Sequence, residues 1–371
     1  MAPVSTTALF LTAASLVILV AGSPTAADLP KPAWTLTPTQ STQRFRGLAP
    51  VSASTAWVAG TNGTILRTED SGATWISVGP SSSSSPPSFN SSTAAEEEAA
   101  LEFRDIAAWS ASHAVALSIG EGPASRIYAT TDGGASWHLA FANADPAAFY
   151  DCLAFSETDP SHGMVMSDPV AAEDGHLHFR LLETRDQGLS WNIAGFAASG
   201  TCLETKSGRW YLATGGAPPL GRVFASADDG LTWNSSVTET PIPAANASQG
   251  VFSVRFRDAA HGLVVGGDYE DPTRSSGTAG WSDDGGVTWS PADKFPGGYR
   301  SGAAWVSGLC SKGAAGAGAA VAVGPTESDF TLDGGRTWHG FDDGSFDAVE
   351  CVGGRVCWAS GEKGRVARLV F

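Results

Sequence analysis

One pattern of eight residues, [ST]-x-D-x-G-x-[ST]-W, occurs six times along this chain and constrains its fold more than any other feature. The first copy runs from Thr68 to Trp75 and the last from Thr331 to Trp338. The copies recur roughly every 40–60 residues, a period that is typical of stacked supersecondary units such as propeller blades. Runs rich in β-forming residues precede and follow each copy, so the pattern predicts a hairpin turn between two strands.

The residue types in the pattern suit a tight turn. An Asp at the start of a turn accepts backbone N–H groups two residues on, and the Gly supplies the positive φ that such turns need. The Trp begins the outgoing strand and is large enough to wedge between neighbouring blades. We interpret the Asp residues as structural, because a functional site does not need six copies, and catalytic duty is the alternative. They are Asp70, Asp132, Asp186, Asp228, Asp284 and Asp333.

The repeat unit can be written as four strands. The first starts at an aromatic residue, as in Phe45–Leu48, the second resembles Trp57–Gly60, and the third and fourth flank the pattern. Six units are complete, whereas a seventh begins at Phe346 and has only three strands. The strand-like piece at 34–37 can supply the missing fourth, which closes the ring and removes an exposed sheet edge. We therefore predict an all-β, seven-bladed β-propeller that forms one domain over residues 28–371.

The repeated pattern resembles the Asp-box of the bacterial neuraminidase repeat proteins, over nearly the whole mature chain. Four further phrases make the chain most similar to the photosystem II assembly/stability factor-like branch of that superfamily: Phe103–Ile106, Ser125–Tyr128, Gly266–Tyr269 and Gly298–Gly302. The resemblance implies a propeller that binds a protein subunit in the manner of a chaperone, without chemistry of its own. The same superfamily fold also serves sialidases, so the fold does not fix an activity.

Composition narrows the choice of partners. The chain of 371 residues has 44 Gly and 13 Trp but only 16% charged residues, which suits short strands and tight turns. Its net charge of −16 argues against nucleic acid and anionic membrane surfaces as partners.

No Rossmann fingerprint or P-loop is present, so we expect no cofactor. We also expect no metal, since the pair His176 and His178 is a weak metal signal and a solvated pair is the alternative. We expect a monomer.

The N-terminus predicts export. An apolar run at 8–21 is followed by small residues to Ala27, which is typical of a cleavable signal peptide over residues 1–27 and hence of a secreted protein. A membrane anchor and targeting to an organelle lumen are the alternatives, and no other stretch is long and apolar enough to span a membrane.

The Ser- and Glu-rich segment 80–100 cannot bury much apolar surface and is predicted to be a disordered insertion. Four N-glycosylation sequons, which favour the secretory route, begin at Asn62, Asn90, Asn234 and Asn246.

The five cysteines are Cys152, Cys202, Cys310, Cys351 and Cys357, and the odd number leaves one of them unpaired. Cys351 and Cys357 flank a short turn and can face each other across a hairpin. Cys152 and Cys202 occupy matching places in consecutive repeats and are a second candidate pair. Buried free thiols are the alternative.

Aligning the repeats at the start of the first strand predicts a site on the axis. The residue after the leading aromatic is Arg46, Arg104, Asp151, Thr201, an ambiguous Phe252 or Ser253, Arg300 and Asp347. First strands line the axis of a propeller, so three arginines are expected to converge there with Asp347 between them and to bind a carboxylate through the guanidinium fork. Asp268 and Tyr269 lie in a loop on the same face. The alternative is that these Arg and Asp residues neutralise each other and simply plug the channel.

Two functions remain open. The first is a non-catalytic scaffold that binds a peptide, a protein, or an anionic small molecule or glycan on the arginine-bearing face. The alternative is a sialidase-like glycoside hydrolase, whose family uses three arginines, a Tyr nucleophile activated by a Glu, and an Asp acid/base. Tyr269 and Tyr299 are the candidate nucleophiles, but neither has an obvious paired Glu, and the Ile-Pro that follows the first sialidase Arg is missing after Arg46.

Overall fold

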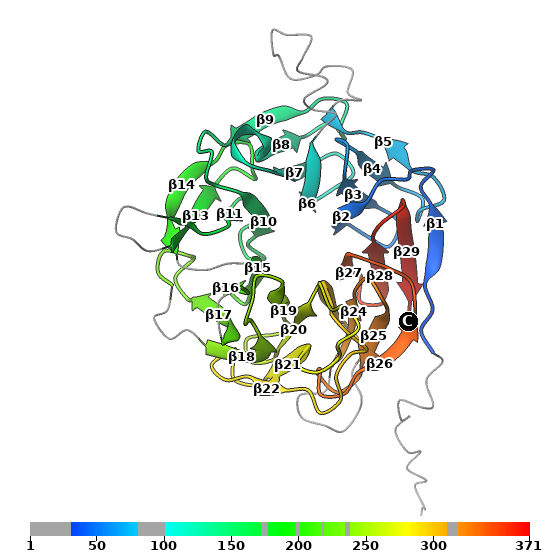
Figure 1. The fold of residues 1–371 in the computed structure, drawn as a ribbon. Coiled ribbons are helices and arrows are strands. Elements are labelled where there is room, and N and C mark those ends of the chain that lie inside the picture. Colours follow the sequence, from blue (N-terminus) through cyan, green and yellow to red (C-terminus); the bar gives the residue numbers. More distant parts are fainter. Residues whose placement is uncertain are drawn as a thin grey trace, which may run out of the picture.

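The computed structural model describes residues 31–80, 101–171, 177–197, 201–216, 219–233, 238–309 and 318–371. These residues form a ring of seven antiparallel β-sheets that radiate from a central axis, as Figure 1 shows. Apart from a 3₁₀ position at Pro80, the described residues hold one helical element, the short 3₁₀ turn η2 (Gly122–Ala124). The prediction of an all-β, seven-bladed propeller is therefore confirmed.

The blades follow one another in chain order, and each is listed from its innermost strand outward. Blade 1 consists of β2 (Phe45–Pro50), β3 (Ala56–Gly60), β4 (Ile65–Thr68) and β5 (Ile76–Ser77). Blade 2 consists of β6 (Glu102–Ala108), β7 (Ala114–Ile119), β8 (Arg126–Thr130) and β9 (His138–Ala142). Blade 3 consists of β10 (Tyr150–Phe155), β11 (Gly163–Ser167), β13 (Leu177–Thr184) and β14 (Asn192–Ala197), with the short β12 (Val170–Ala171) paired to β13.

The second half of the ring repeats this plan. Blade 4 consists of β15 (Thr201–Lys206), β16 (Arg209–Ala213), β17 (Leu220–Ser226) and β18 (Thr238–Pro243). Blade 5 consists of β19 (Gln249–Phe256), β20 (Gly262–Asp268), β21 (Ala279–Ser282) and β22 (Ser290–Pro291). Blade 6 consists of β23 (Gly302–Val306), β24 (Ala319–Val323), β25 (Ser328–Thr331) and β26 (His339–Asp342). Blade 7 consists of β27 (Ala348–Val352), β28 (Val356–Ser360), β29 (Arg365–Val370) and the N-terminal β1 (Thr35–Pro38).

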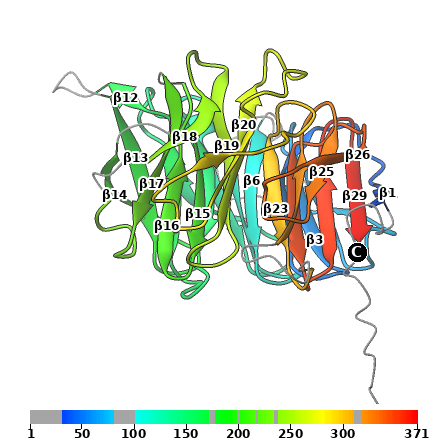
Figure 2. The same cartoon turned by 90° about the horizontal axis from the view of Figure 1, so that it is seen from below.

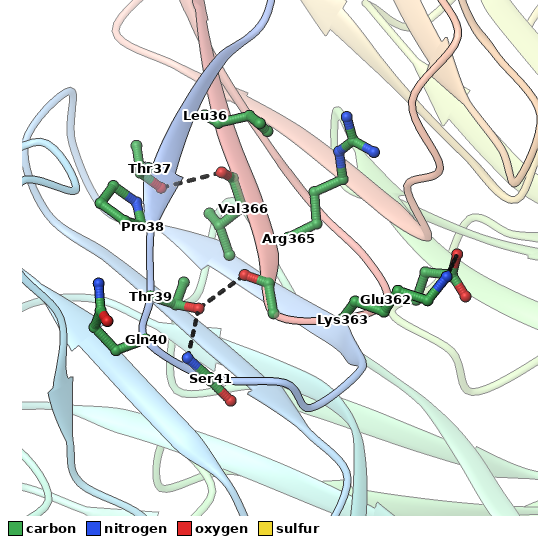
Figure 3. A pocket seen from close by; sticks show the side chains of 11 residues that line it. Leu36, Thr37, Pro38, Thr39, Gln40, Ser41, Glu362, Lys363, Arg365 and Val366 are labelled. Atoms are coloured by element: carbon green, nitrogen blue, oxygen red, sulfur yellow. Dashed lines mark hydrogen bonds and ion pairs between the residues drawn. The ribbon is translucent and has the colours of Figure 1, made fainter.

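The ring is closed by the N-terminal strand, as predicted. β1 pairs antiparallel with β29, and Leu36 lies opposite Ala367; in Figure 1 the blue strand lies along the red one. The Thr37 and Thr39 hydroxyls donate hydrogen bonds to the carbonyls of Val366 and Gly364, at 3.2 and 2.8 Å. Figure 3 shows these bonds beside an open pocket between β1 and the turn before β29. The joint therefore satisfies backbone groups that would otherwise form an open edge.

The core lies in the contacts between neighbouring blades, and tryptophans occupy several of them. Trp137 of the second pattern packs edge-on against Trp57 of the preceding blade, with ring centroids 6.4 Å apart. Trp75 of the first pattern packs in the same way against Trp358 of blade 7, at 6.0 Å. Both partners, Trp57 and Trp358, are fully buried. These pairs bury large apolar surfaces across the joints between blades, as expected for a wedge-like Trp.

The antiparallel order of the strands separates the two faces of the ring. The start of each innermost strand, the end of the second strand and the start of the third lie on one face, which we call the Arg46 face. The turns that carry the repeated pattern lie on the opposite face, which we call the motif face. In the side view of Figure 2, β12 and the loop after β20 stand on the upper edge, and this edge is the Arg46 face.

The cysteines are only partly as predicted. Cys351 and Cys357 form a disulfide between directly opposed residues of β27 and β28, as the hairpin spacing indicated. The predicted pair of Cys152 and Cys202 is wrong, because Cys152 is a buried free thiol. Its side chain packs in the apolar core with Phe179 and Trp210, which explains why it is buried without a covalent partner.

Some predictions concern residues that the structure does not describe. The signal peptide at 1–27, most of the insertion at 80–100, His176 and Cys310 lie outside the described residues. Across the residues that are described, no helix is long and apolar enough to cross a membrane.

Candidate ligand-binding face

The six copies of the repeated pattern share one set of hydrogen bonds on the motif face. In the first copy, Asp70 accepts hydrogen bonds from the Thr74 backbone N–H at 2.8 Å and from the Thr74 hydroxyl at 2.6 Å. The Thr68 hydroxyl donates to Asp70 and accepts from the backbone N–H of Gly72, whose φ is +84°. Donation from the Thr74 side chain, and then from its backbone, lowers the pKa of Asp70 to about 2.

The other five carboxylates make the same pair of bonds within their own turns, to the backbone and hydroxyl of Ser136, Ser190, Thr232, Thr288 and Thr337. Both carboxylate oxygens are thus occupied by the turn itself. The arrangement stabilises a hairpin and leaves little capacity for a ligand.

The Arg46 face is organised by a series of β-bulges at the start of the innermost strands. The pairing register of five consecutive blades shifts by one residue at this point, at Arg46, Arg104, Asp151, position 202 and Phe252. A bulge leaves one residue out of the ladder and redirects its side chain. These bulge positions are equivalent in the five blades, so they lie at the same height along the axis. They also correct the sequence alignment, which placed Thr201 at this position and left Phe252 ambiguous.

Three arginines with acidic partners line part of this face, and we call them the arginine arc: Arg44, Arg46 and Arg104. Arg44 contacts Asp347 through two nitrogens, at 2.5 and 2.9 Å. Arg46 pairs with Glu102 at 3.0 Å, and Arg104 lies 3.8 Å from Asp151. Each pair joins two neighbouring blades. The three arginine side chains remain 43, 29 and 34% exposed, so solvent and ligands can reach them.

The arginines lie close enough to affect one another. Burial, followed by repulsion from Arg44 and Arg104, lowers the pKa of Arg46, while Glu102 and Asp347 oppose this effect. Five charged groups from blades 7, 1 and 2 therefore share one neighbourhood. An added carboxylate would relieve the repulsion between these guanidinium groups.

Arg300 does not join this arc, which corrects the expectation that Arg46, Arg104 and Arg300 converge. Its side chain is fully buried. Its Nε donates to Asp329 at 2.7 Å, and an Nη donates to the carbonyl of Tyr299 at 2.8 Å. The reason is that β23 begins only at Gly302, so Arg300 precedes the strand and does not occupy a bulge. Asp347 also precedes its strand, but it still reaches the arc through Arg44.

Asp151 is the most perturbed carboxyl beside the arc. Its side chain is 4% exposed, and its Oδ1 has no hydrogen-bond partner. Burial raises its pKa to about 6, with a further upward contribution from Asp168 and a downward one from Arg104. Burial also raises the pKa of Asp168 at the end of β11. Arg104 thus lies near two carboxyls that both resist ionisation.

The remaining two candidates lie at the end of β20 in blade 5. Asp268 is buried and accepts a hydrogen bond from the Gln249 side chain at 2.9 Å. Hydrogen bonding, first of all from Ser248, lowers its pKa despite burial. Tyr269 is 50% exposed and contacts Phe252 edge-on. These two residues therefore lie beside an aromatic bulge and not beside the arginine arc.

A second charged cluster, which the sequence did not reveal, lies on the innermost strands around the axis, and we call it the channel cluster. Arg255 pairs with Glu204 at 2.8 Å, and it also contacts Glu350 and donates to the carbonyl of Ala303 at 2.9 Å. It thus connects strands of blades 4, 5, 6 and 7. Burial raises the pKa of Glu204 and of Asp105 to about 7, and it raises the pKa of Glu350 as well. This cluster consists of other residues than the Arg and Asp residues that the sequence suggested would neutralise each other on the axis.

The sequence contained only faint signals for these missed residues. Arg44 lies two positions before Arg46, and Glu102 lies two before Arg104, so a search for alternating charges around the bulges would find both. Glu204, Arg255 and Glu350 lie past the bulges, where the repeats share no residue type. Among the described residues, no group of three or more His, Cys, Asp or Glu side chains is placed to hold a metal ion.

No protein-family model and no curated protein matches this chain in sequence. Its fold is similar to that of solved propellers. YCF48 bound to a D1 peptide superposes with a TM-score of 0.60 at 14% identity, covering 91% of this chain and 97% of that one. YCF48 from Cyanidioschyzon merolae gives 0.60 at 15% identity, covering 91% and 99%. An ancestral GH74 enzyme gives 0.59 at 10% identity, covering 91% of this chain and 46% of the enzyme. Identities this low show a shared fold and nothing further.

Proposed function

We propose that this protein is a non-catalytic binding and assembly scaffold that holds a peptide or another anionic ligand on its Arg46 face. The observation that carries the proposal is the arginine arc. Three partly exposed arginines lie near one another on this face, and each lies at or just before the start of an innermost strand. Such an arrangement can receive a carboxylate, because the planar guanidinium binds its two oxygens together.

The charged cluster around Arg255 supports a ligand that binds at the surface of the ring over one that passes along its axis. Arg255 joins innermost strands of different blades through Glu204 and Glu350, so we expect a ligand on this face to lie across the end of the ring. A peptide fits such a surface better than a compact small molecule, because the bulge positions present separate contacts around the axis. The solved complex of YCF48 with a D1 peptide is a fold-level precedent for a propeller that binds a peptide.

We further propose that the protein works in the secretory route or in an organelle lumen. The disulfide between Cys351 and Cys357 supports this, because disulfides persist in oxidising compartments. The apolar N-terminal run and the sequons point the same way. The resemblance to the photosystem II assembly/stability factor-like branch favours assembly of a protein complex as the task.

A glycoside hydrolase is the second candidate, and one observation favours it. Asp151 has a raised pKa of about 6 and interacts with Asp168, so one carboxyl can stay protonated while another ionises. Glycosidases use such a pair as acid and base. The sialidase version has less support, because Tyr269 and Tyr299 contact Phe252 and the arginines do not form a triad.

The experiment measures binding and turnover on the same preparation. Fluorescein-labelled acidic peptides are titrated with the wild-type protein and with the double variant Arg46→Ala and Arg104→Ala. The control is Arg355→Ala, which removes an exposed arginine from the turn on the motif face. We expect binding that the double variant loses and the control keeps. Hydrolysis of a fluorogenic sialoside or β-glucoside that disappears in Asp151→Asn would instead establish the enzyme.

A further inference from the structure

Three aromatic side chains form a cluster on the Arg46 face, between blades 5 and 6: Phe252, Tyr269 and Tyr299. Phe252 is the bulge residue of β19, and its ring lies edge-on to both tyrosines, at centroid distances of 6.1 Å to Tyr269 and 4.9 Å to Tyr299. Tyr299 is 8% exposed, whereas Tyr269 is 50% exposed. The cluster thus supports the Tyr269 ring through its contact with Phe252 and leaves much of this residue open to a ligand.

The surroundings of this ring are acidic. Asp268 precedes Tyr269, and the exposed Glu270 and Asp271 follow it. Asp268 is fixed in its charged form by hydrogen bonds from Gln249 and from the Glu270 backbone N–H. Arg274 is the one basic residue of the same loop, which therefore carries an excess of negative charge. An exposed aromatic ring in an acidic loop attracts a cation, through the ring quadrupole and through the negative charge of the loop.

The cluster and the arginine arc occupy equivalent places in different blades. Arg46 and Arg104 are the bulge residues of blades 1 and 2, and Phe252 is the bulge residue of blade 5. The blades are arranged around one axis, and β19 lies across the ring from β2 and β6 (Figure 1). This face therefore has a side on which three arginines lie with their acidic partners and, opposite, a side on which the exposed Tyr269 lies in an acidic loop.

From this polarity we propose that the Tyr269 cluster is a subsite for a basic side chain, Arg or Lys, of the same peptide whose carboxylate is held by Arg46 and Arg104. The inference rests on the proposed function and makes it more specific. The ligand is a peptide segment with a basic residue at one end and an acidic residue or free C-terminus at the other. The polarity of the face also fixes the direction in which the segment lies.

A cationic occupant fits the subsite better than an apolar one. An apolar side chain against Tyr269 would displace water from Glu270 and Asp271 without replacing their hydrogen bonds, and burying unpaired carboxylates is unfavourable. A guanidinium can stack on the ring while it donates hydrogen bonds to the carboxylates. A single cation–π contact of this kind changes affinity by about 2- to 30-fold.

The test uses a random peptide library displayed on phage, selected separately on four proteins. These are the wild type, Tyr269→Leu, Tyr269→Phe, and the double variant Arg46→Ala and Arg104→Ala. We expect the wild type to enrich peptides that contain both a basic and an acidic residue. Tyr269→Leu should lose the basic preference and keep the acidic one, whereas Tyr269→Phe retains the ring and should keep both. The arginine double variant should show the reverse loss.

A peptide enriched on the wild type is then resynthesised with citrulline in place of Arg, which keeps the shape and removes the charge. We expect its affinity to fall about 2- to 30-fold on the wild type and to be unchanged on Tyr269→Leu. The double variant Glu270→Gln and Asp271→Asn tests the basic preference in a second way, because it removes the negative charges of the loop and leaves the Tyr269 ring in place. Melting curves of all variants identify any that fail to fold.

The outcomes separate the two proposals. Two outcomes overturn the inference and leave the proposed scaffold function standing. One is enrichment of aromatic or aliphatic residues in place of basic ones. The other is a basic preference that survives both Tyr269→Leu and the double variant Glu270→Gln and Asp271→Asn. Acidic enrichment that survives loss of Arg46 and Arg104 overturns the proposed function of the arc. If no peptide is enriched on the wild type, both proposals fail.

Discussion

The two faces of the ring are built from the same repeats, yet they differ in how uniform they are. On the motif face, six turns carry the same residue types and make the same hydrogen bonds, which each carboxylate completes within its own turn. On the Arg46 face, the equivalent bulge positions carry Arg, Arg, Asp and Phe in blades 1, 2, 3 and 5. The uniform face stabilises blades 1 to 6 in the same way, while the varied face provides different chemistry at different points around the axis.

The comparison teaches that position in a repeat does not by itself assign a role. Arg300 and Arg46 occupy matching places in the sequence, but Arg300 is buried against Asp329 and Arg46 is partly exposed. The difference comes from where each strand begins. Arg46 occupies a bulge of β2, whereas Arg300 lies in the segment before β23 and is buried in an ion pair with Asp329.

The largest expected effect is the loss of the buried arginine. Arg300→Ala should lower the free energy of unfolding by about 3–5 kcal/mol, because it leaves the carboxylate of Asp329 buried and unpaired. Chemical denaturation measures this effect. Arg46→Ala is the matched control and should cost at most about 1 kcal/mol, since exposed ion pairs contribute little. Similar losses for both variants would show that the contrast between the two arginines is wrong.

The second prediction is that the motif turns and the channel respond to pH in opposite directions. Asp105 and Glu204 have folded pKa values of about 7, raised above their unfolded values, so the folded state retains their protons between about pH 4 and 7. Their contribution to stability is complete below about pH 4 and is lost as the pH rises through 7. Asp70 has its pKa lowered to about 2, so its contribution is present above about pH 4 and is lost as the pH falls towards 2.

Denaturation measured from pH 2 to 9 checks this. The wild type should be most stable near pH 4–5, and each channel carboxyl should contribute a decline on the order of 1 kcal/mol per pH unit above that range. Asp105→Asn should flatten part of that decline. A stability that rises steadily from pH 4 to 7, in the wild type and in Asp105→Asn alike, would contradict the account of the channel.

A smaller effect is expected on the motif face. Asp186→Ala removes the acceptor for the backbone and hydroxyl of Ser190, at 2.9 and 2.6 Å, and should cost about 1–2 kcal/mol. The control is Asp293→Ala, an exposed Asp outside the motif turns, which should change stability by less than about 0.5 kcal/mol. Thermal denaturation compares the two variants. If Asp186→Ala kept full stability but lost peptide binding, the motif would be functional after all.

Much of the fold could be predicted from the sequence because the repeat carries its own local chemistry. The Asp, Gly and Trp of each pattern identify the hairpins, and the three-stranded last unit indicates that 34–37 must close the ring. The site was harder to predict, because its geometry depends on single-residue shifts in the pairing register. No residue type in the sequence indicates such a shift. Arg300 was therefore misplaced, Arg44 and Glu102 were overlooked, and the Arg255 cluster was invisible, since its members come from separate blades.

The most direct test of the division between the faces is one affinity measurement on two variants. A fluorescein-labelled peptide selected on the wild type is titrated with the double variant Arg46→Ala and Arg104→Ala, and with Asp186→Ala. We predict that the double variant loses at least about tenfold in affinity, because hydrogen bonds to charged groups are worth about 1.5–3 kcal/mol each, while its stability changes little. Asp186→Ala should bind as the wild type does despite its lower stability. Undiminished binding by the double variant, or lost binding by folded Asp186→Ala, would contradict the account.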